Sequence, residues 1–483
     1  MTIDHLNCPL VVDLDGTLTP SDTLWESIFK LIRRSPVYLF FLPIWLFKGR
    51  SGFKCEIAKH IEINVELLPY NAIFLEYLRQ QKLKGRKLVL ATAAHVSIAN
   101  SVSRHLGVFD LVLATEPDQN LKGSQKLKAI RSLVGDSFVY AGDSKADLPI
   151  WRAARGAILV GTSTGVQSEV RQYTRVECEF PKTRVGAAVW FRAFRVHQWV
   201  KNVLLFVPLL TAFSFTDPSK LVSIAAAFIA FSLGASATYI LNDLWDIEND
   251  RAHLRKRFRP FASAALPIPH GLISAFALLL VSCLLAYAVS SGFLIMLLLY
   301  LVLTTVYSLV LKEYVLMDVI VLALLYTLRI LAGSVAISSL TSSWLLAFSV
   351  FIFLSLALVK RCAELVSIGQ NGIGLIRGRD YRTSDLVVLW PLGVGAALSA
   401  VVIFGLFIND PNNSSRYATP ELLWLVALGL IYWLGRLWLK TSRGEMHDDP
   451  VVYALKNRGS RYTVLGMIGV TIAAHFIKIP ALI

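Results

Sequence analysis

The feature that most constrains the fold of this 483-residue chain is a series of long apolar segments that begins near residue 200. A helix needs roughly 17–25 predominantly apolar residues to cross a bilayer, and most of these segments reach that length. The composition agrees, because 55% of the residues are hydrophobic and only 17% are charged, against about 25% charged in soluble domains. We therefore expect an all-α transmembrane bundle of nine helices, at 200–216, 219–241, 271–289, 291–311, 315–334, 343–359, 385–408, 421–439 and 463–481.

The basic residues follow the expected membrane topology. If the N-terminal part is cytoplasmic, the loops on its side carry 16 Lys and Arg residues, and the opposite loops carry only Lys220, Arg416 and Lys478. This bias fits the positive-inside rule. The formal net charge of +15 is then explained largely by topology, which disfavours a nucleic-acid binder. The five scattered cysteines form no CxxC pair, which argues against a structural zinc site or a disulfide framework.

The first 180 residues have the composition of a soluble α/β domain. Short apolar runs alternate with helical patterns, in PLVVDLDGT, RKLVLATAA, FDLVLAT, SFVYAGDS and GAILVGTS. Strands that alternate with helices indicate a parallel sheet with crossover helices. We therefore expect a Rossmann-like α/β domain over 1–180, a linker with an interfacial amphipathic helix over 181–199, and the transmembrane domain over 200–483. The apolar segment 36–47 is too short to span a bilayer, so it is either a buried helix of the soluble domain or a membrane contact.

Polar groups follow the predicted strands of the α/β domain. Asp13 and Asp15, in VVDLDGTLT, come directly after the first strand, where open parallel sheets place their ligand sites. One carboxylate can attack a phosphorus centre and hold a metal, and the other can act as general acid and base. Oxygen ligands of this kind select Mg²⁺. Later segments add Thr92 and Lys126 as candidate phosphate ligands, and Asp143 and Asp147 as candidate metal ligands.

This set resembles the haloacid dehalogenase (HAD) superfamily of phosphatases, through DxDGT, a strand-end Thr, a Lys and GDSxxD in that order. The resemblance implies Asp13 as nucleophile and Asp15 as acid and base, with Thr92 and Lys126 on the phosphate. It also implies Mg²⁺ held by Asp13, Asp143 and the backbone of Asp15. The insert over about 20–80 looks like the small helical cap of phosphoserine-phosphatase-like members. A folded domain without turnover is the alternative, although no motif residue is missing.

A second acidic group follows the second apolar segment, in YILNDLWDIENDRAHLRKRFRPFAS. Asn242, Asp246 and Asp250 are spaced four apart and would lie along one face of a continued helix, with Asp243 offset by about 100°. Acidic residues beside a membrane are costly unless they are neutralised. Mg²⁺ that carries a diphosphate would neutralise them. The alternative is a solvated loop of mixed charge.

Basic and polar residues recur at the cytoplasmic ends of the other segments. For each one alone, anchoring of the topology explains the residue as well as function does. Together they predict one charged cavity on the cytoplasmic side of the bundle, with Asp318 as a further metal ligand and Arg379, Asp448 and Asp449 nearby. The candidates for phosphate and substrate binding are Lys201, Asn202, Asn242, Arg251, Lys256, Arg259, Lys312, Arg329, Lys360, Arg361 and Tyr381.

NDxxDxxxD at the end of the second of nine helices resembles the UbiA superfamily of intramembrane prenyltransferases. Those enzymes hold a prenyl diphosphate through Mg²⁺ bound to two Asp-rich motifs. The resemblance implies Asp246 and Asp250 in catalysis and Asn242, Asp243, Asp246, Asp250 and Asp318 around the metal. The second motif departs from the family pattern, because Leu322 stands where another carboxylate would follow Asp318.

The finer resemblance is to the decaprenyl-phosphate phosphoribosyltransferase branch of that superfamily. It rests on HQWVKN, NDLWDIENDRAHLRKRFRP, DVIVLALLYTLRILAG, LALVKRCAEL and DDPVVYALKNR. In that branch, phosphoribosyl pyrophosphate (PRPP) donates a 5-phosphoribosyl group to a polyprenyl phosphate. The two resemblances together imply a bifunctional enzyme of cell-envelope biosynthesis in the bacterial plasma membrane, with Mg²⁺ in both domains and the HAD domain removing the 5-phosphate.

Two alternatives stay open. The first is a UbiA-type enzyme that moves a prenyl group from a prenyl diphosphate to an aromatic or other small acceptor, beside a HAD phosphatase of separate purpose. The second is a non-enzymatic membrane protein that binds lipid or acts as a scaffold. A homo-oligomer is compatible with all of these functions.

Overall fold

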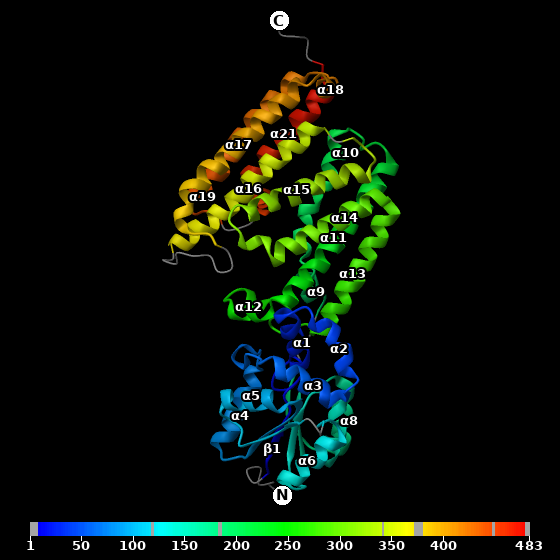
Figure 1. Cartoon of the computed structure of the whole chain (residues 1–483), viewed down its shortest axis with the longest axis vertical. Coiled ribbons are helices and arrows are strands. Elements are labelled where there is room, and N and C mark those ends of the chain that lie inside the picture. The colour runs from blue at the N-terminus through cyan, green and yellow to red at the C-terminus, as the bar shows by residue number, and fades with distance from the viewer. Residues whose placement is uncertain are drawn as a thin grey trace. The chain divides into compact units, whose positions relative to one another are not determined.

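The computed structural model describes residues 8–116, 120–181, 186–340, 342–370, 380–446 and 450–478. The chain forms two compact units (Figure 1). Unit 1 comprises Met1–Phe194 and Tyr239–Phe276, and unit 2 comprises Arg195–Thr238 and Ala277–Ile483. Unit 1 therefore contains the α/β domain together with the segment that joins two long apolar helices.

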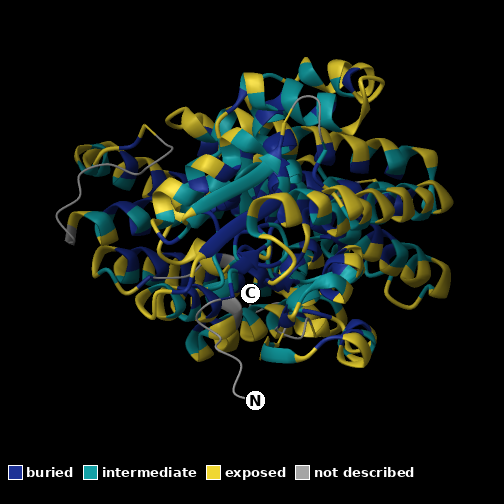
Figure 2. Ribbon diagram, turned by 90° about the horizontal axis from the view of Figure 1, so that it is seen from below, coloured by how far each residue is buried: buried dark blue, intermediate teal, exposed yellow. Residues whose placement is uncertain are grey.

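Unit 1 is built on a six-stranded sheet in the order β3-β2-β1-β4-β5-β6, and every pair is parallel. Leu10 pairs with Leu88 on one side and with Val139 on the other, which places β1 between β2 and β4. The central strands are buried, as the dark blue ribbons of Figure 2 show. The strands are β1 (Leu10–Val12), β2 (Leu88–His95), β3 (Leu111–Thr115), β4 (Val139–Gly142), β5 (Gly156–Val160) and β6 (Val176–Phe180).

Helices cover both faces of this sheet. Because successive side chains of a strand point to opposite faces, Val11 packs with α6, α7 and α8, whereas Leu10 and Val12 pack with α4 and α5. The expected Rossmann-like α/β fold is confirmed. The helices are α4 (Ala72–Leu83), α5 (Val96–Leu106), α6 (Ser124–Val134), α7 (Leu148–Ala153) and α8 (Thr164–Tyr173).

A small helical cap lies between β1 and β2 in the sequence, as expected. Its helices are α1 (Thr23–Arg34), α2 (Tyr38–Leu46) and α3 (Gly49–His60), and they share a core that includes Leu31, Trp45 and Ile57. The side chain of Asp22 accepts hydrogen bonds from the backbone of Leu24 and Trp25, which satisfies two otherwise unpaired donors at the start of α1. Within the predicted linker, α9 (Ala187–Ala193) forms a short helix.

Seven described helices are long and apolar enough to cross a membrane, by length and composition. They correspond to seven of the nine expected segments, and the last expected segment, 463–481, overlaps α21 (Arg458–Phe476), which begins five residues earlier. The short helices α12 (Ile247–Ala252), α18 (Pro411–Ser414) and α20 (Pro450–Lys456) lie between them. The seven are α11 (Pro218–Trp245), α13 (Ile268–Val289), α14 (Ser291–Leu309), α15 (Met317–Ala336), α16 (Ser343–Gln370), α17 (Leu386–Asn409) and α19 (Leu423–Ser442).

The first expected segment, 200–216, differs from the expectation of one long helix. It contains most of the 3₁₀ helix η4 (Val196–Phe206), followed by the short helix α10 (Val207–Thr211). The backbone of η4 packs closely on α15, because a Cβ added at Gly333 would lie 2.1 Å from the carbonyl oxygen of Leu205. Tight packing of this kind outweighs the helical preference of an apolar run.

Candidate functional site

The first candidate site lies at the carboxyl ends of three adjacent strands in unit 1. Asp13 follows β1, Thr92 lies in β2, and Asp143 follows β4. The chain proceeds from β1 to β2 on one side, whereas β4 pairs with β1 on the other. A crevice forms where strand order reverses in this way, and α/β sheets bind their ligands there. The topology thus gathers residues that are far apart in the sequence.

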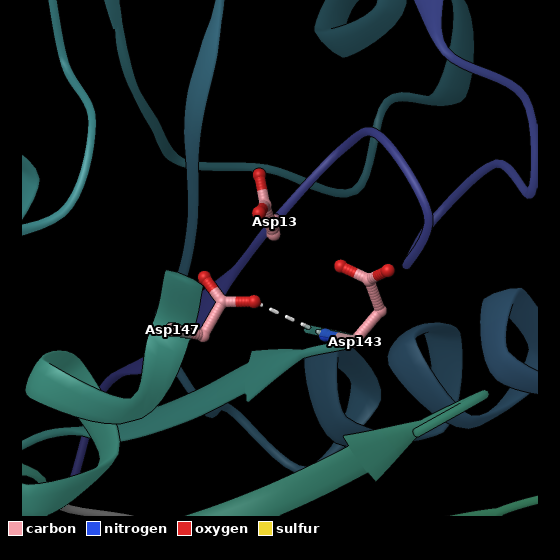
Figure 3. Close-up of side chains that lie close together, drawn as sticks. All are labelled: Asp13, Asp143 and Asp147. Carbon is pink, nitrogen blue, oxygen red and sulfur yellow. Dashed lines mark hydrogen bonds between the residues drawn. The ribbon is translucent and has the colours of Figure 1, made fainter. Parts of the chain in front are cut away.

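Three carboxylates converge at this edge of the sheet (Figure 3). The ligand atoms of Asp13, Asp143 and Asp147 all lie within 4.8 Å of one another, and within the described ranges this is the one such group of three His, Cys, Asp or Glu residues. The backbone N–H of Asp143 donates to Asp147 Oδ2 over 3.2 Å. Gly16 has a φ of +79°, and a Cβ there would lie 2.3 Å from Asp143 Oδ2. The oxygen ligands and the closely fitted turn suit a divalent cation such as Mg²⁺.

One buried lysine balances part of this negative charge. Lys126 Nζ lies 2.9 Å from Asp13 Oδ1 and donates to the hydroxyl oxygen of Tyr140 over 2.7 Å. The Tyr140 hydroxyl donates in turn to Asp147 Oδ1 over 2.8 Å. Burial raises the pKa of Asp13, and the ammonium of Lys126 opposes that shift. Sequence reasoning missed Tyr140, because an aromatic residue inside a buried strand has the pattern of a core residue.

Asp15 is held by the first turn of the cap helix α1. The backbone N–H and the hydroxyl of Thr23 donate to its two oxygens over 2.9 Å and 3.2 Å. Burial, reinforced by the charge of Asp22, raises the pKa of Asp15 to about 8. A carboxyl group that stays protonated near neutral pH can donate a proton to a leaving group. Thr23 was missed as well, although the capping residue Asp22 marks the start of this helix.

Thr92 and a lysine of the cap border the same site. Thr92 Oγ1 accepts a hydrogen bond from Ala94 N over 3.0 Å, which leaves its hydroxyl hydrogen for another acceptor. Lys54, from α3, donates to the carbonyl oxygen of Ala93 over 2.6 Å. Burial lowers the pKa of Lys54. No sequence signal marks Lys54, because a single lysine in a helix is usually a solvated residue.

The second predicted acidic group lies at the end of α11 and in α12. The N–H of Asp246 bonds to the carbonyl of Asn242 over 3.0 Å, and the N–H of Asp250 bonds to that of Asp246 over 2.8 Å. The four-residue spacing therefore stays helical, although the helix assignment is interrupted at Asp246 itself. Asn242 and Asp246 are half-buried, and Asp243 and Asp250 are buried.

Arg259 bridges two of these carboxylates. Its Nη1 lies 2.7 Å from Asp250 Oδ2 and 3.1 Å from Asp243 Oδ1. Burial raises the pKa of Asp250, and the charge of Arg259 opposes the shift. A guanidinium thus stabilises the acidic segment, whose carboxylates do not form a three-ligand group of the kind seen at Asp13.

Arg251, predicted as a phosphate ligand, binds the cap. Its two terminal nitrogens donate to both carboxylate oxygens of Glu26 in α1 over 2.8 Å and 2.7 Å, and its Nε donates to Ala262 O over 2.9 Å. Both side chains are nearly inaccessible, at 6% and 7% exposed. Lys30 of α1 also pairs with Glu248 of α12 over 2.7 Å. Two ion pairs therefore fasten the cap to the acidic segment.

Several predicted residues of unit 2 bind one another in a buried network. Asp318 in α15 lies 2.6 Å from Arg361 Nη2 and accepts a hydrogen bond from the Tyr381 hydroxyl over 2.5 Å. Arg361 also pairs with Glu364. Asp318, Arg361 and Tyr381 are fully buried. Two carboxylates, Asp318 and Glu364, therefore face this buried guanidinium, whose Nε has no hydrogen-bond partner among the described residues.

A second buried network surrounds Arg329. Its Nε donates to Asn202 Oδ1 over 3.0 Å, and its Nη2 donates to the Tyr300 hydroxyl over 2.9 Å. An arginine inside an apolar helix needs such partners. Lys201 Nζ lies 5.7 Å from the centroid of the Tyr326 ring. Of the other predicted cations, Lys312 and Lys360 are half-buried and Lys256 is exposed, and the predicted residues Arg379, Asp448 and Asp449 lie outside the described residues.

Seven apolar helices and an α/β domain with a carboxylate centre define an integral membrane protein with an appended hydrolase-like domain. The model of the UbiA prenyltransferase family matches residues 203–456, and the model of the haloacid dehalogenase-like hydrolases matches residues 10–152. The chain belongs to the UbiA prenyltransferase family, and its N-terminal domain is HAD-like. Both resemblances drawn from the sequence are confirmed.

Individual relatives cover different parts of the chain. The uncharacterized protein y4nM of Sinorhizobium fredii is 39% identical over 489 residues, which is 99% of this chain and 93% of that protein. The decaprenyl-phosphate phosphoribosyltransferase of Mycobacterium tuberculosis is 31% identical over 290 residues, which is 59% of this chain and 93% of that protein. A solved UbiA homolog from Archaeoglobus fulgidus covers 60% of this chain and all of its own, at 14% identity and a TM-score of 0.45.

Proposed function

We propose that this protein transfers the 5-phosphoribosyl group of PRPP to a polyprenyl phosphate and then removes the 5-phosphate from the lipid product. The observation that carries the proposal is the fusion of two complementary parts. A region similar to decaprenyl-phosphate phosphoribosyltransferases is joined to a HAD-like domain in which Asp13, Asp15, Lys126 and Asp143 meet at one sheet edge. The product of the first reaction carries the phosphate monoester that the second part is equipped to hydrolyse.

In the transfer step, a phosphate oxygen of the lipid attacks the anomeric carbon of the ribose. The bond from that carbon to the pyrophosphate breaks, and pyrophosphate leaves. No protein base is needed, because the attacking oxygen is already an anion. We assign Asn242 and Asp246, the half-buried members of the acidic row, to the Mg²⁺–PRPP complex, and Lys256 and Arg259 of the same unit to its phosphates. Mg²⁺ would supply the positive charge that lets pyrophosphate leave.

The arginines held in buried networks have a different role in this proposal. Arg251, Arg329 and Arg361 each direct their nitrogens to protein oxygens. We therefore assign them to positioning of the segments that carry the substrate ligands. Asp318, engaged by Arg361 and Tyr381, belongs to the same group. Because Asp318 is already paired with Arg361 and Leu322 replaces the next carboxylate, the second acidic motif is incomplete. This disfavours ordinary prenyl transfer to an aromatic acceptor.

In the hydrolysis step, a carboxylate oxygen of Asp13 attacks the phosphorus of the 5-phosphate. The bond from phosphorus to the ribose oxygen breaks, and that oxygen takes the proton of Asp15. The ionised Asp15 then accepts a proton from water as the water attacks the aspartyl phosphate, and inorganic phosphate leaves. Lys126 stabilises the transferring charge, and Thr92 can donate its hydroxyl to a phosphate oxygen. A divalent cation on Asp13, Asp143 and Asp147 would neutralise the phosphate and keep the nucleophile ionised.

A lipid-extraction assay on the full chain in detergent tests both steps. The assay supplies PRPP labelled in the ribose, a polyprenyl phosphate and Mg²⁺, and it compares Asp13→Asn, Asp246→Asn and the control Asp136→Asn, whose side chain is 85% exposed. We expect the wild type and the control to form a dephosphorylated lipid. Asp13→Asn should accumulate the phosphorylated lipid, and Asp246→Asn should leave the label in water.

Two results would overturn parts of the proposal. No label in lipid from folded wild-type protein, together with transfer from a labelled prenyl diphosphate, would favour the prenyltransferase alternative. If the wild type forms a labelled lipid that keeps its 5-phosphate, the lipid product is not a substrate of the HAD domain.

A further inference from the structure

The cap exposes an unusually apolar helix. The sequence of α2, YLFFLPIWL, contains no charged residue, and Phe40 is 79% exposed, while Phe47, just beyond the helix, is 92% exposed. Soluble surfaces rarely carry a contiguous apolar patch of this size without a use for it. The exposed members, which we call the α2 patch, are Val37, Leu39, Phe40, Phe41, Ile44, Leu46 and Phe47.

The helix that carries the α2 patch packs against the other helices of the cap. Trp45, the buried residue of α2, stacks on the His60 ring with a centroid distance of 5.4 Å. The Tyr38 hydroxyl lies 3.4 Å from His60 Nδ1. Trp45 and Tyr38 also join the core that α2 shares with α1 and α3. The inner side of α2 is therefore packed, and the α2 patch is its outer side.

Basic residues flank the α2 patch at both ends. Arg33 and Arg34 close α1, while Lys48 and Arg50 stand at the start of α3. Arg34, Lys48 and Arg50 are exposed, and Glu56, 3.0 Å from Lys48, offsets only part of this charge. Cations beside an apolar helix complement anionic lipid headgroups. In a symmetric dimer of two α2 patches the same cations would face each other, which makes a second copy the less complementary partner.

The chain itself brings unit 1 to a membrane. Both α11 and α13 are long and apolar enough to cross a bilayer, and the end of α11 and the start of α13 belong to unit 1. The α2 patch therefore belongs to a unit that is joined directly to two candidate membrane spans. At nine residues, α2 is about 14 Å long, against about 30 Å for the hydrocarbon core, so it cannot span.

We propose that the α2 patch lies in the interfacial layer of a bilayer that contains anionic lipids, as a monotopic anchor of the phosphatase cap. The helix that follows it, α3, carries Lys54 to Ala93 beside Thr92. The anchor would thus hold the phosphatase site at the height of a lipid-linked phosphate. This last role rests on the proposed function, whereas the anchor itself does not.

Depth-dependent quenching in nanodiscs tests the anchor on the full chain. The two test variants, Phe40→Cys and Phe47→Cys, carry an environment-sensitive fluorophore in a background without the accessible native cysteines. The matched controls are Ile73→Cys and Leu83→Cys in α4, which are comparably exposed apolar positions of the same unit, at 75% and 87%. We expect lipids with a nitroxide near the headgroup to quench the test positions at least about threefold more than the controls. The excess should shrink when anionic lipid is replaced by zwitterionic lipid.

Equal quenching at all four positions would overturn the anchor. Disulfide formation between two copies of Phe40→Cys, without lipid quenching, would assign the α2 patch to a second copy and would also overturn it.

A ratio of two activities tests the positioning role. Phe40→Asp combined with Phe47→Asp should lower hydrolysis of the lipid-linked phosphate about tenfold or more relative to hydrolysis of p-nitrophenyl phosphate, because only the lipid substrate needs the bilayer contact. An unchanged ratio would overturn this role. If the wild type hydrolyses no lipid substrate, the proposed function fails, and the quenching result still decides the anchor.

Discussion

The two acidic groups of unit 1 show two ways to assemble negative charge. Asp13, Asp143 and Asp147 come from separate segments and meet because neighbouring strands end at one sheet edge. Asn242, Asp246 and Asp250 come from one helical stretch and keep the spacing of the sequence. The first group converges on a small volume with one lysine, whereas Arg259 already links two carboxylates of the second. A sheet edge thus brings residues that are remote in the sequence into a compact centre. A helix instead arranges its carboxylates in a row, and here a separate basic residue, Arg259, links two of them.

The largest expected effect comes from filling the turn at the sheet edge. Gly16→Ala would place a methyl group 2.3 Å from Asp143 Oδ2, and a displacement of about 1 Å at such a site can cost about 100-fold in rate. We expect phosphate release from the lipid product to fall at least that far, while transfer to lipid continues. Gly107→Ala is the control, because Gly107 also has positive φ but has nothing within 4 Å of its Cβ position. Equal losses for both variants would show that backbone strain, and not the contact with Asp143, limits the activity.

The next effect concerns the buried ion pair between Arg361 and Asp318 in unit 2. Arg361→Ala leaves Asp318 buried without its guanidinium, which typically costs about 3–5 kcal/mol, so the midpoint of thermal unfolding in detergent should fall strongly. Lys440→Ala, which removes a partly exposed pair with Glu445, should cost less than about 1 kcal/mol.

A double variant separates positioning from substrate binding at this pair. Arg361→Met with Asp318→Leu should recover most of the stability, since an apolar pair can replace a buried ion pair. Recovery of transferase activity along with stability would support a positioning role. A stable but inactive double variant would return both residues to the binding machinery.

The pH dependence of phosphate release is the third comparison. In the proposed hydrolysis, Asp15, with a pKa raised to about 8, has to be protonated when the ribose oxygen leaves. Its protonated fraction falls as the pH rises through that value, so the rate of phosphate release should fall about tenfold per pH unit above about 8. The proposed transfer to lipid does not involve Asp15, so its rate should not follow the same curve. A phosphatase rate that is flat from pH 7 to pH 10 would contradict the role of Asp15.

A conservative change at Thr23 sharpens this test. The Thr23 hydroxyl donates to the Asp15 carboxylate and so lowers its pKa. Thr23→Val removes that donor, and the inflection of the rate profile should move to higher pH.

The smallest expected effect is at the cap lysine. Lys54→Met keeps the length of the side chain but removes the donor to Ala93 O. We expect kcat/KM for the lipid-linked phosphate to fall about tenfold, the loss expected of one charged hydrogen bond, and kcat/KM for transfer to stay the same. Lys59→Met, at an exposed position of the same helix, is the control and should change neither.

The order of motifs in the sequence predicted the α/β domain, and the structure brings Asp13, Asp143 and Asp147 of those motifs together. Each motif follows a strand, and parallel strands bring their carboxyl ends to one edge. Tyr140, Glu26 and Lys54 could not be found in this way, because each is a single residue whose partner comes from a distant segment. The segment 200–216 shows the same limit. Its hydropathy fits a membrane helix, but the close contact at Gly333 and the Asn202–Arg329 bond depend on another helix.

The salt bridge between Glu26 and Arg251 bears on how these two domains can be inherited. Both side chains are nearly inaccessible when the two segments are packed together, so a chain that lost its first domain would expose the Arg251 guanidinium and remove its carboxylate partner. Replacement of the phosphatase by another hydrolase would require an acidic residue at the same place or a second change at Arg251. We therefore expect that a relative with a different first domain also differs at the position of Arg251.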